Sequence, residues 1–316
     1  MDASVTIAAV QLRNDPGEAE ERRAAIAAAV ARAADVGAHL VVLPELSHSA
    51  YVPNAAVWGL GEALDGPSVA HVRALARDHR VHLGAGLVLR EGEDVVNAYV
   101  LADDAGEVVG VVRKRFPETY CFLSVDGPVA IDTRWGRVGV AICADNHRID
   151  TFERVRAAGV RLHLMPHAWA MPVRAGGLVS DTDMEVPAAR ARDLCRTYAD
   201  YLGVPAVFVN AVGPLPRMDG LLGGLMVPER FALGGLSQLA TPDGGTFGPL
   251  GDEPGMVLAT VELGPVDVEA REPPTWDGWL HPGQPLLRRA LMPLDAWWGR
   301  RVYRARRTRQ GHHAEA

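Results

Sequence analysis

The chain is organised around Arg137-Val-Gly-Val-Ala-Ile-Cys143-Ala-Asp145-Asn-His147, where a run of β-forming residues ends abruptly at a cysteine and polar residues follow. Val138, Val140 and Ile142 alternate with small residues, which is typical of a buried strand. Open α/β sheets bind ligands at the carboxyl ends of their strands, so the Cys143 thiol stands where a nucleophile could act. Alone, the signal is weak, because free cysteine is usually an inert buried residue.

The composition is that of an ordinary globular protein. The 316 residues, 48% of them hydrophobic and 22% charged, suffice for one large α/β domain or two small ones. A net charge of -7 argues against a nucleic-acid binder, although arginines gather in residues 300–309. Three cysteines (Cys121, Cys143, Cys195) without metal-type spacing predict reduced thiols in a cytoplasm. The N-terminus lacks a cationic leader, and no apolar run reaches the roughly 18 residues of a membrane span. We therefore expect a protein that is neither exported nor membrane-spanning.

The first half of the chain predicts a mixed sheet. Residues 5–12 and 39–43 have strand patterns and flank an Ala-rich helical pattern at 18–37, which indicates a parallel, covered sheet. A second helix is predicted at 67–80. Three strands with tight turns follow at 81–89, 95–101 and 107–112, so antiparallel pairing is expected there.

The second half continues the alternation of strands and helices. Helices are predicted at 150–159 and 187–201, and strands at 161–165 and 204–209. Residues 171–186 and 213–235 lack clear periodicity, and we expect them to form loops over a site. Residues 236–240 and 256–263 are expected to form a closing hairpin.

Two charged residues also stand at predicted strand ends. Glu45 follows Leu43-Pro44, and Lys114 lies between two arginines where the 107–112 strand ends. Both are ordinarily interpreted as solvated surface charges. A rigidly held glutamate could instead act as a base near neutrality, and a held lysine could stabilise an oxyanion.

With Cys143, these residues form a pattern that resembles the nitrilase superfamily of carbon-nitrogen hydrolases, in its amidase-like branch. The matching pieces are collinear over residues 5–265: Ile7-Ala-Ala-Val-Gln11, Val41-Val-Leu-Pro-Glu45, Asn97-Ala-Tyr-Val, Gly106-Glu-Val-Val-Gly-Val-Val-Arg-Lys114, Gly139-Val-Ala-Ile-Cys143-Ala-Asp145, Gly235-Leu-Ser237 and Thr241-Pro-Asp-Gly244. The resemblance implies an α/β fold, an α-β-β-α sandwich with mixed sheets that commonly dimerises through its helices.

The resemblance also implies catalytic roles. Glu45 would be the general base, Cys143 the nucleophile, and Lys114 with the backbone N–H of Ala144 the oxyanion site. Glu118 matches a second glutamate that orients the lysine and the substrate. The implied reaction releases an amine or ammonia, leaves a thioester on the cysteine and ends with hydrolysis to an acid. No metal or organic cofactor is implied.

The residues around the site are candidates for substrate binding. They are Tyr51, Ala144, Asn146, His147, His167 and Trp169. Where many members carry an aromatic or acidic residue after the cysteine, this chain has Ala144, and the polar residues beyond it suggest a substrate with hydrogen-bonding groups. His147 could equally cap the next helix, His167 could be a satisfied buried histidine, and Trp169 could belong to the core. The spacing of His147, His163 and His167 fits no metal site.

The family pattern ends near residue 270. We therefore predict a hydrolase domain over 1–270 and a C-terminal extension over 271–316. Leu287, Leu291, Leu294, Trp297 and Trp298 share a helical register before the arginine cluster. We favour an arm that packs on a partner subunit over a basic helix at a membrane surface, and expect residues 310–316 to be disordered.

These observations predict a cysteine-dependent hydrolase that cleaves a carboxamide or N-carbamoyl carbon-nitrogen bond in a small molecule, and that forms a homodimer or larger homo-oligomer. Nitrile hydrolysis or acyl transfer on the same residues is the alternative chemistry. A papain-like pair of Cys143 and His147 is disfavoured, since Glu45 already supplies a base. A non-catalytic scaffold of the same fold is a further alternative.

Overall fold

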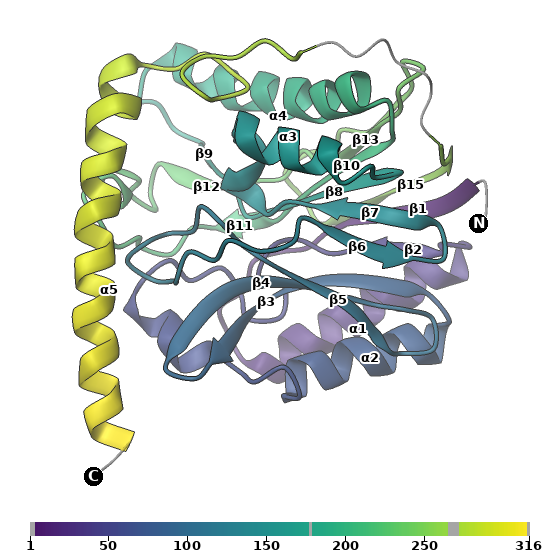
Figure 1. Ribbon diagram of the computed structural model, residues 1–316, viewed down its shortest axis with the longest axis horizontal. Coiled ribbons are helices and arrows are strands. Elements are labelled where there is room, and N and C mark those ends of the chain that lie inside the picture. The colour runs from purple at the N-terminus through teal and green to yellow at the C-terminus, as the bar shows by residue number, and fades with distance from the viewer. Residues whose placement is uncertain (1–3, 177–178, 265–271, 315–316) are drawn as a thin grey trace.

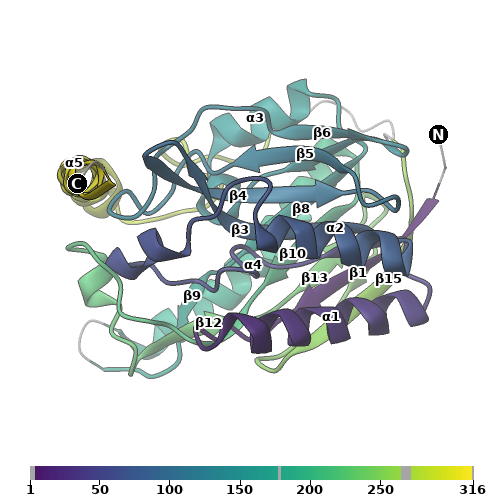
Figure 2. The same cartoon turned by 90° about the horizontal axis from the view of Figure 1, so that it is seen from below.

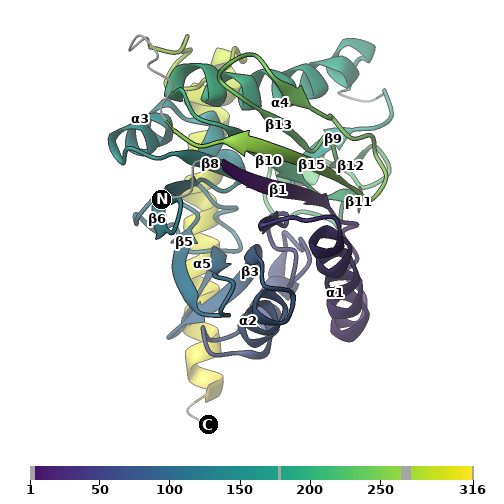
Figure 3. The same cartoon turned by 90° about the vertical axis from the view of Figure 1, so that its right-hand side faces the viewer.

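The fold is an α-β-β-α sandwich, as predicted. The structure, a computed structural model, describes residues 4–176, 179–264 and 272–314. Two sheets pack face to face, and helices cover both outer faces (Figure 1). α1 (Ala19–Asp35) and α2 (Pro67–His79) lie together on one side, while α3 (Ile149–Ala157) and α4 (Asp181–Leu202) lie on the other (Figure 3).

The first sheet has six strands within the described residues, in the order β15-β1-β2-β3-β4-β5. β1, β2 and β3 are parallel neighbours, and β4 and β5 continue antiparallel, which confirms the predicted change of pairing. Their bounds are β1 Ser4–Gln11, β2 Leu40–Val42, β3 His82–Glu91, β4 Asp94–Ala102, β5 Val108–Arg113 and β15 Gly255–Glu262.

The second sheet has the order β14-β13-β10-β8-β7-β6, with β7, β8 and β10 parallel. The bounds are β6 Ala130–Thr133, β7 Gly136–Val140, β8 Leu162–His167, β10 Ala206–Asn210, β13 Gln238–Ala240 and β14 Thr246–Phe247. The predicted closing hairpin is wrong. The turn after β13 leads into β14, whereas β15 crosses to the other sheet and pairs with β1. Local sequence shows a turn, but the partner of an edge strand is decided by tertiary packing.

The two predicted loops are partly structured. β9 (Ala170–Pro172), β11 (Val212–Pro214) and β12 (Phe231–Gly234) form a small sheet, and a short 3-10 helix, η3, spans Gly223–Leu225. α4 begins at Asp181, ahead of the predicted start at residue 187. Pro187 favoured a helix start there, because proline is common in a first turn, but it lies inside the helix.

Three apolar layers hold the sandwich together. The central layer joins the facing sheets and includes Val42, Leu101, Val140, Ile142 and Leu164. The Ala-rich face of α1 and one face of α2 pack on the outside of the first sheet. α3 and α4 pack on the outside of the second sheet. Because strands from both sheets are covered on two faces, their ends are held rigidly.

The C-terminal extension forms a long helix, α5 (Met292–Ala314), preceded by a π-helical turn, η4 (Leu287–Leu291). α5 runs along one side of the sandwich (Figure 1) and is seen end-on in Figure 2. The backbone through Ala314 is described as helical, residues 315–316 lie outside the described part, and disorder from residue 310 stays a prediction. No helix in the described ranges is long and apolar enough to span a membrane.

Candidate active site

Three strand ends bring the predicted catalytic residues to one place. Glu45 follows β2, Lys114 follows β5, and Cys143 follows β7 and begins a short 3-10 helix, η2 (Cys143–His147). β2 and β5 belong to the first sheet and β7 to the second, so the group lies between the sheets. Glu45 and Lys114 are each 1% exposed, so neither is a solvated surface charge.

Glu45 is fixed by three donors. Its Oε1 atom accepts from Lys114 Nζ at 2.6 Å and from Asn97 Nδ2 at 2.7 Å. Its Oε2 atom accepts from the Ala168 backbone N–H at 2.8 Å. Gly86 on β3 makes room for this arrangement, since a Cβ atom there would lie 2.2 Å from the Leu46 nitrogen and 2.7 Å from the Glu45 carbonyl carbon.

Lys114 lies between two carboxylates. Besides Glu45, its Nζ atom donates to both oxygens of Glu118 at 3.1 Å. Glu118 Oε1 also accepts from the Tyr51 hydroxyl at 2.9 Å. Tyr51 is thus linked to Lys114 through Glu118, which places this predicted substrate-binding residue beside the charged group.

Cys143 adopts an unusual backbone conformation. Its φ is 48°, in the left-handed region that is uncommon for residues other than glycine. Such strain persists only where surrounding structure enforces it, and it is frequent at active sites. The Cys143 side chain contacts the central core, and the residue is 9% exposed. The Ala168 N–H that binds Glu45 is also within hydrogen-bonding reach of the thiol.

Burial and charge set the protonation of this group. Burial raises the pKa of Glu45, and the Lys114 ammonium opposes that shift. Burial alone would lower the pKa of Lys114, but the carboxylates of Glu118 and Glu45 raise it well above its usual value. Burial and then the Glu45 carboxylate raise the pKa of the Cys143 thiol, against the effect of Lys114. These shifts favour a neutral thiol and a charged ammonium beside the buried Glu45 carboxyl group.

Asp145 joins the turn after Cys143 to the loop after Lys114. Its two carboxylate oxygens accept from the backbone N–H groups of Phe116 at 2.8 Å and Arg115 at 3.1 Å. Burial raises the pKa of Asp145 to about 6. These two bonds fix the relative positions of the thiol and the ammonium.

Asn146 and His163 are hydrogen-bonded to each other beside the η2 turn, and Asn146 also binds the backbone of that turn. Asn146 is fully buried, and its amide donates to the carbonyl oxygens of Ala141 at 2.6 Å and Cys143 at 3.4 Å. Its Oδ1 atom lies 3.0 Å from His163 Nε2. The hydrogen bonds of Asn146, which we expected to meet substrate, are directed at the protein.

The aromatic candidates form a cluster behind the turn. The His147 ring lies edge-on to Trp169, with centroids 4.7 Å apart, and to His167 at 6.0 Å. His147 Nδ1 lies 3.0 Å from Nε2 of His281, a residue of the C-terminal extension. Its side-chain hydrogen bond within the described residues is therefore to His281 rather than to the thiol, and His147 does not cap α3.

His167 has one ring nitrogen in use and one free. Nδ1 lies 2.8 Å from the Met165 carbonyl oxygen, so it carries the proton. Nε2 is buried and has no partner among the described residues. Burial lowers the pKa of His167 to about 3. The ring is therefore neutral and offers a buried hydrogen-bond acceptor.

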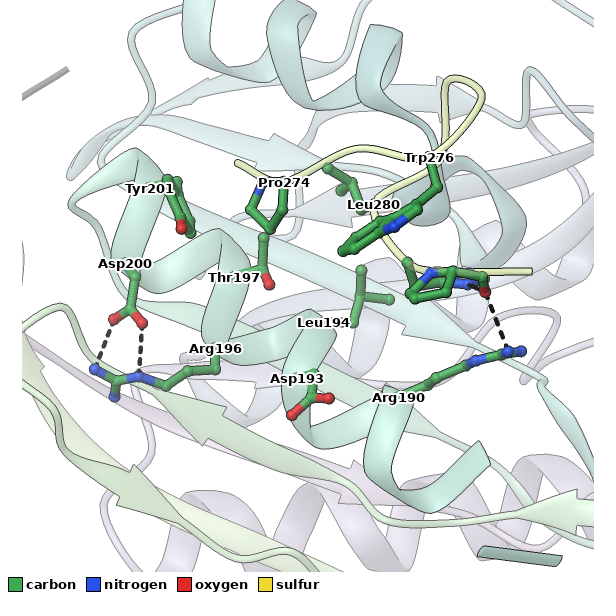
Figure 4. Close-up of a pocket in the computed structure, with 12 residues that line it drawn as sticks. Arg190, Asp193, Leu194, Arg196, Thr197, Asp200, Tyr201, Pro274, Trp276 and Leu280 are labelled. Atoms are coloured by element: carbon green, nitrogen blue, oxygen red, sulfur yellow. Dashed lines mark hydrogen bonds and ion pairs between the residues drawn. The ribbon is translucent and has the colours of Figure 1, made fainter. Parts of the chain in front are cut away.

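Ala144 is partly exposed and lines a cavity of about 270 Å³ together with residues of the C-terminal extension. A second cavity, of about 340 Å³, lies between α4 and residues 274–282 (Figure 4). The ion pair of Arg196 with Asp200 lies at one end of that second cavity. None of Glu45, Lys114 and Cys143 lines it, so it is not the site that the strand ends form. Within the described residues, no three His, Cys, Asp or Glu side chains converge as a metal site.

Several supporting residues were missed. Asn97 lies in a matching segment but carries no signal of its contact with Glu45, and the Ala168 donor is a backbone group that any residue would supply. His281 lies outside the family pattern and meets His147 only through tertiary packing.

The α-β-β-α fold is that of solved amidases of the nitrilase superfamily. The carbon-nitrogen hydrolase family matches residues 6–268, and the chain belongs to this family.

Characterised relatives are distant. The chain is 28% identical to citrullinase of Francisella tularensis, over 52% of this chain and 62% of that protein. It is 28% identical to the bifunctional nitrilase/nitrile hydratase NIT4B of Nicotiana tabacum, over 44% of this chain and 47% of that protein. The matches thus span about half to three fifths of these relatives. An amidase from Nesterenkonia sp. superimposes with a TM-score of 0.67 at 25% identity, over 83% of this chain and 92% of that one. A variant of that amidase shows Michael addition of acrylamide at its active-site cysteine.

Proposed function

We propose that this protein hydrolyses a non-peptide carbon-nitrogen bond, in a small carboxamide or N-carbamoyl compound, through a thioester on Cys143. The observation that carries the proposal is the buried pair of Glu45 and Lys114, 2.6 Å apart, beside a thiol held in a left-handed turn. Burying two charges is costly unless they are well paired, and here each makes further hydrogen bonds. Buried charged groups with shifted pKa values are concentrated at catalytic sites.

In the first half-reaction, Cys143 attacks the substrate carbonyl carbon while Glu45 accepts the thiol proton. The raised pKa of the thiol means that it is not ionised at rest, so proton removal must accompany attack. The raised pKa of Glu45 makes its carboxylate a stronger base than an exposed one. The tetrahedral oxyanion is stabilised by the Lys114 ammonium and by the Ala144 backbone N–H. Glu45 then returns the proton to the leaving nitrogen, and ammonia or an amine departs.

In the second half-reaction, water attacks the thioester carbonyl. Glu45 takes the proton from water, and the same oxyanion site stabilises the second tetrahedral intermediate. Collapse of the intermediate expels the Cys143 sulfur, which recovers its proton, and releases the carboxylic acid. Lys114 keeps its charge throughout, because its two carboxylate partners raise its pKa.

The surrounding residues would position the substrate. Glu118, held by Lys114 and Tyr51, orients the ammonium and presents a partly exposed carboxylate to the substrate nitrogen. The unpartnered Nε2 atom of His167 is a hydrogen-bond acceptor for a substrate N–H, with His147 and Trp169 packed beside it. Asn146 would act indirectly, by holding the turn that bears Cys143.

The N-carbamoyl (ureido) case is supported by the similarity of the chain to a citrullinase. There Cys143 would attack the carbamoyl carbon and the substrate amine would leave with the proton returned by Glu45. Water would then hydrolyse the S-carbamoyl intermediate to carbamic acid, which breaks down to carbon dioxide and ammonia. Nitrile hydrolysis and acyl transfer to an amine are the alternative reactions on these residues. A scaffold without activity is disfavoured by the buried charges and the strained thiol turn.

Ammonia release tests this proposal. Wild-type protein is assayed with a panel of primary amides, N-carbamoyl amino acids and nitriles, beside Cys143→Ala. We expect turnover of at least one class and its loss in Cys143→Ala. The matched control is Cys195→Ala, which alters another buried thiol, whose sulfur contacts the Ala206 carbonyl oxygen in the α4 layer. Turnover that survives in Cys143→Ala would refute the assignment.

A further inference from the structure

A cavity lies beside Ala144, the residue that follows the proposed nucleophile. It measures about 270 Å³, and its walls come from the loop after Lys114, the η2 turn, the C-terminal extension and the start of α5. Ala144 follows Cys143 directly and contributes to the lining of the cavity. The cavity therefore begins one residue from the proposed nucleophile.

The lining is strongly cationic. Arg148, Arg288 and Arg300 line the cavity, and its lining includes no aspartate or glutamate. Neither Arg148 nor Arg300 forms an ion pair with a described residue. Arg288 donates to neutral groups: the carbonyl oxygens of Trp276 at 3.2 Å and Pro282 at 3.0 Å.

Two of these cations are held in place by aromatic rings. The Arg148 guanidinium lies between Phe116 and Trp279, at 5.0 Å and 4.9 Å from their ring centroids. Arg288 lies over the same Trp279 ring at 4.6 Å. These contacts fix the guanidinium groups without neutralising them. The Arg148 Nε atom is buried without a hydrogen-bond partner among the described residues, which is an unfavourable state that a ligand could relieve.

Neighbouring arginines also contribute to the positive potential of the cavity. Burial and the nearby cations of Arg190 and Arg148 lower the pKa of Arg288, and Asp277 offsets only part of this. Asp277 is itself paired with Arg289. The cavity thus keeps a positive potential in a protein whose net charge is -7.

We propose that this cavity is a subsite for a carboxylate carried by the substrate, bound by Arg148, Arg288 and Arg300. The substrate would then be a carboxamide or ureido compound that also bears an acid group. This inference rests on the proposed function, since it takes Cys143 as the point of attack. Guanidinium groups suit the assignment because they bind carboxylates through paired hydrogen bonds. Two of the three arginines come from the C-terminal extension, which would therefore set specificity.

A pair of alkylating reagents tests the subsite without knowledge of the substrate. N-(chloroacetyl)-β-alanine carries a carboxylate, and N-(chloroacetyl)butylamine is an uncharged analogue of similar length. In both, the thiol displaces chloride and forms a thioether, which is located by peptide mass. The ratio of the two rates at Cys143 is compared with the same ratio for free glutathione, which reports intrinsic reactivity.

We expect the acid-to-neutral ratio at Cys143 to exceed the glutathione ratio roughly tenfold, the effect of one charged hydrogen bond. Arg288→Gln and Arg300→Gln should each lower the excess severalfold, and added salt should reduce it. Arg304→Gln is the matched control, because Arg304 is an exposed arginine of α5 outside the cavity. Arg300 is exposed as well, so its variant is not expected to disturb folding.

A ratio equal to that of glutathione would overturn the subsite, as would an equal loss in Arg304→Gln, which would indicate only the general field of the helix. Labelling of Cys143 by neither reagent has a different meaning: it would contradict the reactive thiol and hence the proposed function.

Discussion

In the proposed mechanism, transfer of a proton from Cys143 to Glu45 governs the chemistry at the scale of single residues. Burial raises the pKa of both groups, which keeps the thiol neutral and makes the carboxylate more basic. The base must be ionised to act, so kcat/KM should fall as pH drops through the pKa of Glu45. Because that pKa is raised, the fall should lie above about 4.3, the value of an exposed glutamate. A pH profile of kcat/KM checks this, and an acid limb at or below that value would contradict it.

Glu45→Gln should keep the shape of the site but remove the base. We expect kcat to fall by roughly 10²–10⁴, the usual contribution of general base catalysis. Single-turnover measurement of ammonia release isolates the acylation step. Glu229→Gln, at an exposed position, is the control. Near-normal acylation in Glu45→Gln would exclude this residue as the base.

At the scale of elements, β3 must pass very close to the chain that carries Glu45. A Cβ atom at Gly86 would overlap the Leu46 nitrogen and the Glu45 backbone, so Gly86→Ala requires the end of β2 to move. We expect a loss of about 1–3 kcal/mol in the free energy of unfolding, as for other overpacked positions, and a lower kcat. Chemical denaturation and steady-state kinetics measure the two effects.

Gly59→Ala provides the comparison for this test, because a Cβ atom at Gly59 meets no atom within 4 Å. If Gly86→Ala were as stable and active as Gly59→Ala, the tight fit around Glu45 would be wrong.

Some features of the fold and the site could be predicted from the sequence, and others could not. Local patterns placed Glu45, Lys114 and Cys143 at strand ends, and the resemblance to the nitrilase superfamily joined them as one predicted site. The pairing of β15 with β1 could not be predicted, because an edge strand of alternating residues is compatible with either sheet. Nor could the contact of His281 with His147, since no local pattern links the extension to the η2 turn.

At the scale of the whole molecule, α5 is attached to the sandwich by a few specific contacts. Tyr303 is buried, its ring lies 4.9 Å from Trp58, and its hydroxyl donates to Asp94 Oδ1 at 3.0 Å. Tyr120, close to Glu118 in the chain, donates to Asp295 of α5 at 2.9 Å. The helix therefore supports the loop that carries Glu118.

Tyr303→Ala should remove the main anchor of α5. A loss of about 3 kcal/mol is expected from comparable deletions of buried aromatic residues, with a rise in KM as the Glu118 loop loses support. Thermal unfolding and kinetics test this against Arg304→Ala, which changes an exposed residue of the same helix. A fully stable Tyr303→Ala variant would mean that α5 is held by other contacts.

The role of α5 as an arm on a partner subunit stays a prediction. Within one chain, Trp297 and Trp298 are 43% and 50% exposed although the helix is docked on its own sandwich. With Leu294, which is 53% exposed, these two rings form the apolar surface of α5 on which the predicted contact with a second copy would lie.

The thioester on Cys143 is tested most directly by intact mass. Protein is mixed with the activated aryl ester of an accepted acyl group, whose fast acylation lets the intermediate accumulate, and quenched in acid within one turnover. A mass increase equal to the acyl group is expected, which disappears in Cys143→Ala and changes with the acyl chain. The covalent route through this thiol would be contradicted by a burst of released phenol without any increase in protein mass. A mass increase that persists in Cys143→Ala would contradict it as well.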